Sequence, residues 1–386
     1  MGFITSIRNL VSSVFQGIFG PISDRIGRKL LLLIGLALSF VITTILIFIG
    51  TTEVLIISAI IQSFAVCIFT PSWNASLGDV TDIDTRASYI GKLTAAGQIF
   101  SVSATIIAAI FFYLIKQYEG WIVWGWRVNI PWQTQYAIAF AISAVAYAIS
   151  IIAVLLMKET NVTKESVNFK DRSEFFKPFK NVQFRNFLIV HIIFCFMMSL
   201  IWPLTPMIQI SLLNMEIYHI AIVSATFAVC MGVFQVIGGR LADRIGRKKV
   251  IIIGASVLLF FPVSYIPAIV TGKWWLAIFT NIVAGTGSGL FYTTINTYIL
   301  DLAKDKTNMG SFVGWKESLK GISTFLGSLS AGFIVDALIQ RYDLVIAGVI
   351  MSVAVSILRL FAYIGYYFIV DSMRKATLES DLAVNQ

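Results

Sequence analysis

The hexapeptide Asp24-Arg25-Ile26-Gly27-Arg28-Lys29 occurs a second time, unchanged, as Asp243-Arg244-Ile245-Gly246-Arg247-Lys248. The two copies lie 219 residues apart in a chain of 386 residues. Each copy follows an apolar run that ends in glycine, and each precedes another apolar run. A repeat at this distance predicts that the chain consists of two related halves.

The composition places both halves in a membrane. Apolar residues make up 58% of the chain and charged residues only 13%, whereas soluble domains carry about 25% charged residues. Apolar runs of about 20 residues recur, which is the length that a helix needs to cross a bilayer core. They are too long and too uniform for alternating barrel strands. We therefore predict an all-α membrane protein with eleven spans, at about 1–19, 30–50, 54–78, 88–115, 135–157, 187–209, 219–238, 250–271, 274–300, 312–338 and 343–369.

The charge distribution predicts the orientation of the spans. The formal net charge is +9, but its placement argues against a nucleic-acid partner. With the spans alternating, 23 of the 29 Lys and Arg residues fall on the face of the two hexapeptides and four on the opposite face. Such a bias marks the cytoplasmic side. We therefore expect a multi-pass protein of the plasma membrane with a cytoplasmic C-terminus.

Polar stretches divide the predicted chain. An N-terminal bundle covers 1–157 with five spans, a cytoplasmic linker covers 158–186, a C-terminal bundle covers 187–370 with six spans, and a tail covers 371–386. The first half therefore has one helix fewer than the second. We expect that a helix upstream of Met1 was lost, through a wrong start codon or a real truncation. Translating the coding DNA upstream of Met1 would test this.

The repeat extends beyond the hexapeptide. Asn74-x4-Asp79 at the end of one span matches Asn296-x4-Asp301, and Lys92-x4-Gly97 matches Lys316-x4-Gly321. The offset between matching positions grows from 219 to 222 and then to 224 residues, as insertions in loops would cause. The three cysteines have no metal-ligand spacing, and we predict neither a metal nor a cofactor.

Each hexapeptide belongs to a longer pattern, G-x-x-x-D-R-x-G-R-K, from Gly20 to Lys29 and from Gly239 to Lys248. This pattern resembles the signature loop of the major facilitator superfamily. The resemblance implies a two-bundle fold of twelve helices, here without the first. It also implies a secondary transporter in the lipid bilayer, which moves a small-molecule substrate by alternating access, driven either by the gradient of the substrate itself or by a coupled proton or ion. We expect the protein to be a monomer.

The signature residues have two readings. They anchor the topology, or they form a cytoplasmic latch that favours one access state. For the latch we predict cross-half ion pairs of Asp24 with Lys316 and of Asp243 with Lys92, each worth about 1 kcal/mol or less. The predicted gating set is Gly20, Asp24, Arg25, Gly27, Arg28, Lys29, Lys92, Gly239, Asp243, Arg244, Gly246, Arg247, Lys248 and Lys316.

Ionisable groups within spans are candidates for substrate binding or coupling, because they are costly in lipid. Arg8 could hold an anionic substrate, or it could lie at a frayed outer end. Glu317 and Lys320 could couple protons, or they could neutralise each other near the cytoplasmic mouth. His191 could relay protons. We expect Arg359 to snorkel toward the cytoplasm.

Neutral polar residues supply further candidates. The sequence Trp202-Pro203-Leu204-Thr205-Pro206 predicts a kink that forms either a gate or a static packing site. The remaining candidates are amides spaced through the spans, namely Gln62, Gln98, Gln235, Asn281 and Asn296.

Three rival functions remain at this stage. A membrane sensor with the same fold would usually need a signalling domain, and the tail has only sixteen residues. A drug/proton antiporter is disfavoured because the Gly-Pro pattern of that group is missing from Gly91–Phe112, and a basic residue is missing from 54–78. An enzyme would need a cluster of catalytic groups, which the sequence does not show. The sequence also contains no nucleotide-binding loop, which argues against an ATP-driven pump.

Overall fold

The computed structural model describes residue 10 and residues 12–117, 122–123, 126–127, 132–158, 172–303 and 308–371. The first set of helices is α2 (Gln16–Ile26), α3 (Arg28–Phe48), α4 (Thr52–Asp79), α5 (Arg86–Gln117) and α6 (Trp132–Leu156). The second set is α7 (Val182–Ser199), α8 (Leu204–Met207), α9 (Ile217–Ile245), α10 (Arg247–Ser264), α11 (Ile266–Thr271), α12 (Leu276–Leu302), α13 (Met309–Ile339) and α14 (Leu344–Ile364). Short elements are the 3-10 helices η1 (Arg172–Lys180) and η4 (Gly365–Phe368) and the π-helical turn η2 (Ile208–Leu212).

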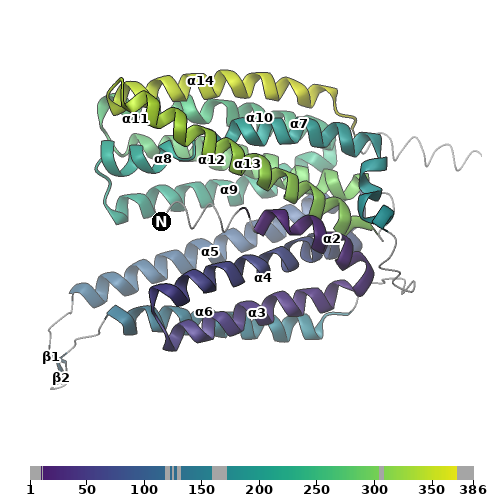
Figure 1. Cartoon of the computed structure of the whole chain (residues 1–386), viewed down its shortest axis with the longest axis horizontal. Coiled ribbons are helices and arrows are strands. Elements are labelled where there is room, and N and C mark those ends of the chain that lie inside the picture. The colour runs from purple at the N-terminus through teal and green to yellow at the C-terminus, as the bar shows by residue number, and fades with distance from the viewer. Residues whose placement is uncertain are drawn as a thin grey trace, which may run out of the picture.

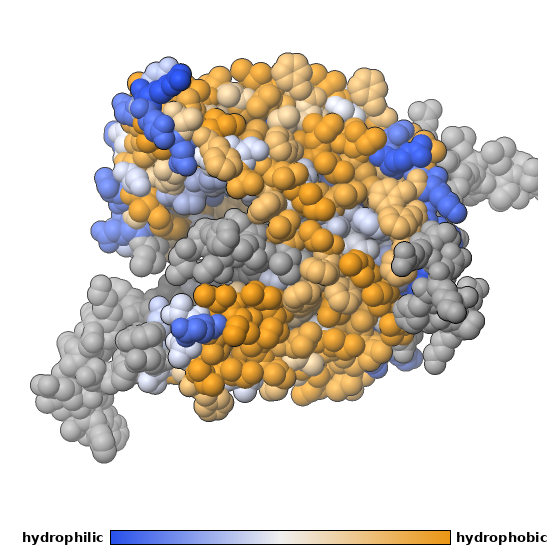
Figure 2. Space-filling view, viewed as in Figure 1, coloured by the Kyte–Doolittle hydropathy of each residue, from blue (hydrophilic) through white to orange (hydrophobic). Residues whose placement is uncertain are grey.

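The helices form two groups that lie one above the other in Figure 1. We call α2–α6 the N-terminal bundle and α7–α14 the C-terminal bundle. Nine helical segments of the described residues are long and apolar enough to cross a membrane. Their outer surfaces form the broad apolar belt of Figure 2, with polar residues toward the ends. The chain is therefore a multi-pass, all-helical membrane protein apart from one hairpin, in which β1 (Ile122–Val123) pairs antiparallel with β2 (Trp126–Arg127).

Both signature sequences lie at one end of the molecule, which we call the signature end. The opposite end, where β1 and β2 lie, we call the far end (Figure 1). The connections at the signature sequences are much shorter than the predicted loops. Helix α2 continues through Asp24 to Ile26, and α3 begins at Arg28. Only Gly27 separates the two helices, at a φ of 111°, and only Gly246 separates α9 from α10, at 98°. Such positive φ values favour glycine, which has no Cβ.

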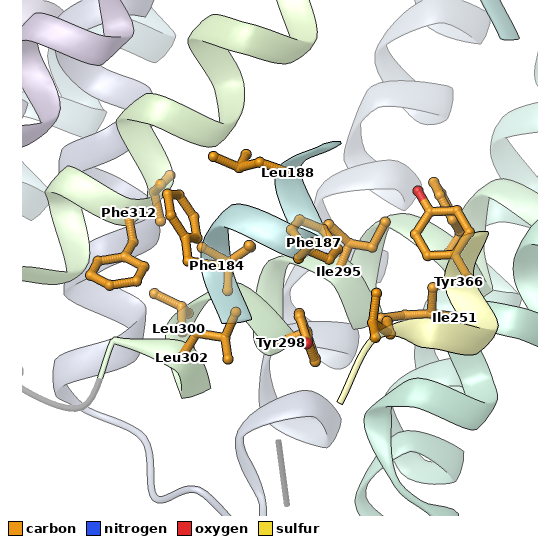
Figure 3. Packing of buried hydrophobic residues seen from close by; sticks show 14 of the residues in the cluster. Phe184, Phe187, Leu188, Ile251, Ile295, Tyr298, Leu300, Leu302, Phe312 and Tyr366 are labelled. Atoms are coloured by element: carbon orange, nitrogen blue, oxygen red, sulfur yellow. The ribbon is translucent and has the colours of Figure 1, made fainter. Parts of the chain in front are cut away.

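Aromatic side chains fill the core of the C-terminal bundle. Phe184 of α7 packs against Phe312 of α13, and Phe187 packs against Tyr298 of α12 (Figure 3). Tyr366 of η4 belongs to the same cluster and packs against Phe194 and Phe291. All are fully or almost fully buried. This core lies close to the signature end, and it connects α7, α12 and α13 into one packed unit.

The predicted kink after α7 is present. Helix α7 ends at Ser199, residues 200–203 form a turn, and α8 and η2 follow before α9 begins. Pro203 and Pro206 have no backbone N–H to continue the hydrogen-bond ladder, which accounts for the break. Trp202 lies in the turn and is exposed.

Candidate functional site

Asp24 joins the N-terminal bundle to the start of helix α13. One carboxylate oxygen accepts the backbone N–H of Gly310 at 2.8 Å, and the other accepts the N–H and the hydroxyl of Ser311, both at 2.7 Å. Since α13 begins at Met309, these amides belong to its first turn and have no partner inside the helix. A buried carboxylate also complements the positive end of the helix dipole. Asp24 therefore caps a helix of the opposite bundle.

Asp243 makes the same arrangement in the other direction. It belongs to the C-terminal bundle and accepts the backbone N–H of Ala87 at 3.2 Å and of Ser88 at 2.7 Å. Both amides lie in the first turn of α5, which begins at Arg86. The two aspartates of the repeated hexapeptide thus form two equivalent connections between the bundles at the signature end. We call them the Asp24 latch and the Asp243 latch.

The arginine four residues after each aspartate ties it to a second carboxylate. Arg28 contacts both Asp24 and Asp79. Arg247 binds Asp243 at 2.6 Å and Asp301 at 3.0 Å. Asp79 and Asp301 are equivalent members of the extended repeat, at an offset of 222 residues. That recurrence was the only sign of their importance in the sequence, and it did not indicate that they bind the arginines.

The Asp243 latch has an additional ion pair between the bundles. Arg86, the first residue of α5, donates to Asp301 of α12 at 2.7 Å, and Arg247 donates to the carbonyl oxygen of Ile83 at 2.6 Å. The repeat offset of 224 places Gly310 at the position equivalent to Arg86. Glycine has no side chain, so residue 310 cannot form the ion pair that Arg86 makes in the Asp243 latch.

The remaining basic signature residues bind at helix ends. Lys29 donates to the carbonyl oxygens of Leu155 and Met157 at the end of α6, at 2.8 and 2.7 Å. Lys248 donates to Tyr367 at the end of the last span, at 2.7 Å. Cations are favoured at helix C-termini. Arg25 lies 4.7 Å above the ring of Phe175 in η1, whereas Arg244 is exposed.

Glycines bring the helices of the two bundles into close contact below each latch. A Cβ on Gly20 would clash with the backbone of Gly310 and Gly314 in α13, and a Cβ on Gly239 would clash with Ala87 in α5. Both glycines belong to the signature pattern. Small residues permit such close backbone approach in membranes. Helices α2 with α13 and α5 with α9 therefore close the signature end.

The predicted ion pairs of the two aspartates with lysines are wrong. Lys316 contacts Glu317 and donates to the side-chain oxygen of Asn296 at 2.8 Å. Lys92 is exposed, while Asp243 binds the backbone amides of Ala87 and Ser88, five and four residues earlier in the same helix. The prediction named the correct pairs of helices but expected lysine side chains as donors, whereas the donors are backbone amides. Every helix begins with such amides, so the sequence does not indicate which of them bind a carboxylate.

A charged cluster lies deeper in the C-terminal bundle. Glu317 contacts Lys316 with one oxygen and Lys320 with the other, and all three side chains belong to α13. Lys316 and Glu317 are 3% and 12% exposed, whereas Lys320 is 30% exposed. The structure thus joins two predicted candidates, Glu317 and Lys320, with Lys316, which the sequence had placed in the latch. Asn296 completes this cluster.

Arg359 does not snorkel as predicted. It is completely buried and donates to the carbonyl oxygens of Leu258 at 2.8 Å and Met198 at 2.7 Å. Its helix turns this residue toward α7 and α10, so the guanidinium finds backbone oxygens inside the bundle rather than water.

The other candidates are dispersed. His191 is buried and shares a hydrogen bond of 3.0 Å with the hydroxyl of Tyr366. Gln62 bonds Ser39 and Tyr147 within the N-terminal bundle, and Asn281 bonds its own helix. The backbone of Gln235 contacts Gly91, and the side chain of Gln98 lies 3.4 Å from the Cβ position of Gly232. Arg8 lies outside the described residues.

Two bundles of membrane-spanning helices, related by repeat and joined by two equivalent latches, define a class of membrane transporter. The family model of the Major Facilitator Superfamily matches residues 1–218 and 187–376. The chain belongs to the major facilitator superfamily, and it is a secondary transporter rather than an enzyme.

Individual relatives are distant. Multidrug resistance protein 1 of Bacillus subtilis (strain 168) is 25% identical over 363 residues, which cover 92% of this chain and 86% of the relative. Multidrug resistance protein MdtG of Proteus mirabilis (strain HI4320) is 22% identical and covers 86% of this chain and 78% of its own length. The crystal structure of the human organic anion transporter MFSD10 (TETRAN) matches with a TM-score of 0.70 at 13% identity, over 95% of this chain and 83% of that one.

Proposed function

We propose that this chain carries a small organic solute across the plasma membrane by alternating access, and that the signature end is its cytoplasmic gate. The pair of latches supports this proposal most directly. Each latch joins opposite bundles through groups that can separate without breaking either bundle. With both latches formed, the cytoplasmic side is closed and the solute enters from outside.

The energy of the latches suits a gate. A carboxylate that caps a helix contributes about 1–2 kcal/mol. Two such contacts would bias the access equilibrium by about 2–4 kcal/mol, or roughly 30- to 1,000-fold. Binding of a solute or of a coupled ion can offset a bias of this size, since a ligand shifts an equilibrium by its differential affinity for the two states.

The proposed organisation follows the predicted one. The bundles 1–157 and 187–370 move against each other as a monomer, and the linker 158–186 and the C-terminal tail 371–386 lie in the cytoplasm. Contacts of η1 with both bundles agree with this arrangement: Trp315 donates to the carbonyl oxygen of Phe175 at 2.7 Å, while Arg25 covers the ring of the same residue.

A distance measurement between spin labels tests alternating access without a known substrate. Cys67, Cys195 and Cys230 are first replaced by alanine. One label pair joins exposed positions at the signature end, Asp84→Cys and Lys249→Cys, and a second joins the far end, Thr51→Cys and Lys273→Cys. In vesicles, combining Asp24→Asn with Asp243→Asn should lengthen the first distance and shorten the second. The proposal is wrong if both distances stay unchanged or if both lengthen.

A drug/proton antiporter is the second candidate, because two relatives are named multidrug resistance proteins. It predicts that export of a cationic dye from the vesicle lumen acidifies the lumen, because each dye molecule that leaves is exchanged for a proton that enters. A transport-inactive sensor predicts that no solute moves although the label distances change.

A further inference from the structure

The middle of the C-terminal bundle has an excess of positive charge. In the described part of this bundle, four charged side chains lie at least seven residues from the ends of their spans: Lys316, Lys320, Arg359 and the single carboxylate Glu317. Glu317 contacts both lysines, so it can balance the charge of only one. Arg359 bonds two neutral carbonyl oxygens. Uncompensated charge in a membrane interior is costly, and a ligand of opposite charge would relieve it.

The exposed part of Lys320 faces the interior of the protein and not the lipid. Side chains four and seven residues away share the face of a helix with a given residue. Of these neighbours of Lys320, Val313, Lys316 and Gly327 are buried and Thr324 is half-buried. The first exposed residues along α13 are Leu326, Leu329 and Phe333, and they lie on the side of the helix opposite Lys320. A side chain that is 30% exposed on an inward face must therefore border the space between helices.

Lys320 also lies where the two bundles meet. The next residue, Gly321, packs against Ser13, and the hydroxyl of Ser318 donates to the carbonyl oxygen of Val14 at 3.0 Å. Lys320 is eight residues from Phe312, where the predicted span in α13 begins, which is about 12 Å along a helix. A bilayer core is about 30 Å thick. Lys320 therefore lies well inside the core, in the part of α13 that packs against the N-terminal bundle.

We propose that Lys320, held by Glu317 and supported by Lys316, binds the carboxylate or sulfonate group of an organic anion. This inference rests on the proposed transport function and names its substrate class. Lys316 is buried and bound to Asn296 and Glu317, so it supplies charge rather than contact. Glu317 fixes the position of the Lys320 ammonium, which leaves its remaining N–H donors for the ligand. The anion completes the charge balance of the cluster.

Two dyes with the same xanthene ring and opposite charge test the proposal: 6-carboxyfluorescein as the anion and rhodamine 123 as the cation. Binding to the purified, reconstituted protein is measured by fluorescence anisotropy, and uptake is measured in vesicles. Lys320→Gln should weaken binding of 6-carboxyfluorescein by about 10- to 100-fold, as expected for loss of a charge-assisted hydrogen bond. Lys320→Arg keeps the charge and should stay within about threefold of the unmodified protein.

The outcomes separate this inference from the proposed function. Undiminished binding of 6-carboxyfluorescein by Lys320→Gln, or no binding of it by the unmodified protein, overturns the anion site. Uptake of rhodamine 123 in preference to 6-carboxyfluorescein, unaffected by Lys320→Gln, also overturns it while transport itself stands. The spin-label distances are measured without any dye, so their failure concerns alternating access alone. An unchanged melting temperature of Lys320→Gln confirms that the variant is folded.

Discussion

At the residue scale, the structure assigns each part of the repeated hexapeptide a separate physical task. The aspartate caps a helix of the other bundle, the glycine makes a turn of one residue, and the arginine holds the aspartate in place. The lysine binds carbonyl oxygens where the last helix of its own half ends. The aspartate is the member that acts between the bundles, so the first prediction concerns it.

Replacing Asp24 by asparagine should weaken the Asp24 latch. The amide keeps one acceptor but loses the charge that favours the helix dipole, which costs about 1 kcal/mol. We expect the cytoplasm-open state to gain roughly fivefold in population. The measurement is the alkylation rate of a cysteine at Ser318, a buried position between α13 and the N-terminal bundle. Asp82→Asn, an exposed aspartate at the same end, should leave the rate unchanged. An equal rate in Asp24→Asn and Asp82→Asn would contradict the latch.

A second prediction follows from the ion pair of Arg86 with Asp301 in the Asp243 latch. Arg86 is buried, and removing it takes away one of the two arginines that bind Asp301. Arg86→Gln should therefore lower the stability of the purified protein by about 3 kcal/mol, measured by thermal unfolding in detergent. Combined with Asp301→Asn, the loss should be smaller than the sum of the two single losses. Strict additivity would show that the two residues do not interact.

At the scale of elements, the sequence predicted the helices well and their ends poorly. The apolar runs located the nine spans that the described residues show, because the membrane requires a minimum length of apolar helix. Of the other two predicted spans, 274–300 corresponds to helix α12, and residues 1–9 and 11 of the span 1–19 lie outside the described residues. The runs missed Gly20 to Ile26 at the end of α2 and Met309 to Ser311 at the start of α13, because polar residues continue a helix beyond the bilayer. Those extra turns contain the Asp24 latch, so the sequence did not predict that the amides of Gly310 and Ser311 are its donors.

The buried charges were misjudged for a related reason. The roles predicted for Arg359 and Lys316 came from their positions along their spans. Their actual surroundings depend on which face of the helix each residue occupies. Arg359 faces α7 and α10, and Lys316 faces Asn296 of α12. A nearly uniform apolar helix gives little indication of its inward face in lipid, since both faces are apolar.

Helix α5 offers a matched pair of glycines for a third prediction. A Cβ on Gly91 would collide with the backbone of Gln235 in α9, while Gly97, six residues later, has nothing within 4 Å of its Cβ position. Gly91→Ala should force α5 and α9 apart and reduce transport about tenfold or more. Gly97→Ala should leave transport within about twofold and raise helix stability slightly. Equal transport by the two variants would mean that close contact of α5 with α9 is dispensable.

At the scale of the whole molecule, the two latches act on one equilibrium. They bind different helix pairs, and they share no side chain among the described residues. Effects at separate sites usually add as free energies. Each latch should therefore multiply the population of the closed state by its own factor.

The fourth prediction tests this multiplication. If Asp24→Asn and Asp243→Asn each raise the cytoplasm-open population about fivefold, the double variant should raise it about 25-fold. The populations come from the spin-label distance distributions at the signature end. A double variant no more open than the stronger single variant would indicate that one latch alone controls the gate. Asp82→Asn added to either single variant provides the control.

The one-residue joints at Gly27 and Gly246 leave the chain no slack at the gate. A long helix precedes and follows each of these glycines. The lysine two residues after the glycine binds the second of these helices to the end of the last helix of the same half. When an aspartate is released from its latch, both helices and the helices packed against them are therefore expected to move together. Under the proposed gating, opening of the signature end therefore requires rotation of an entire half, and we expect this slow, collective step at the centre of the transport cycle.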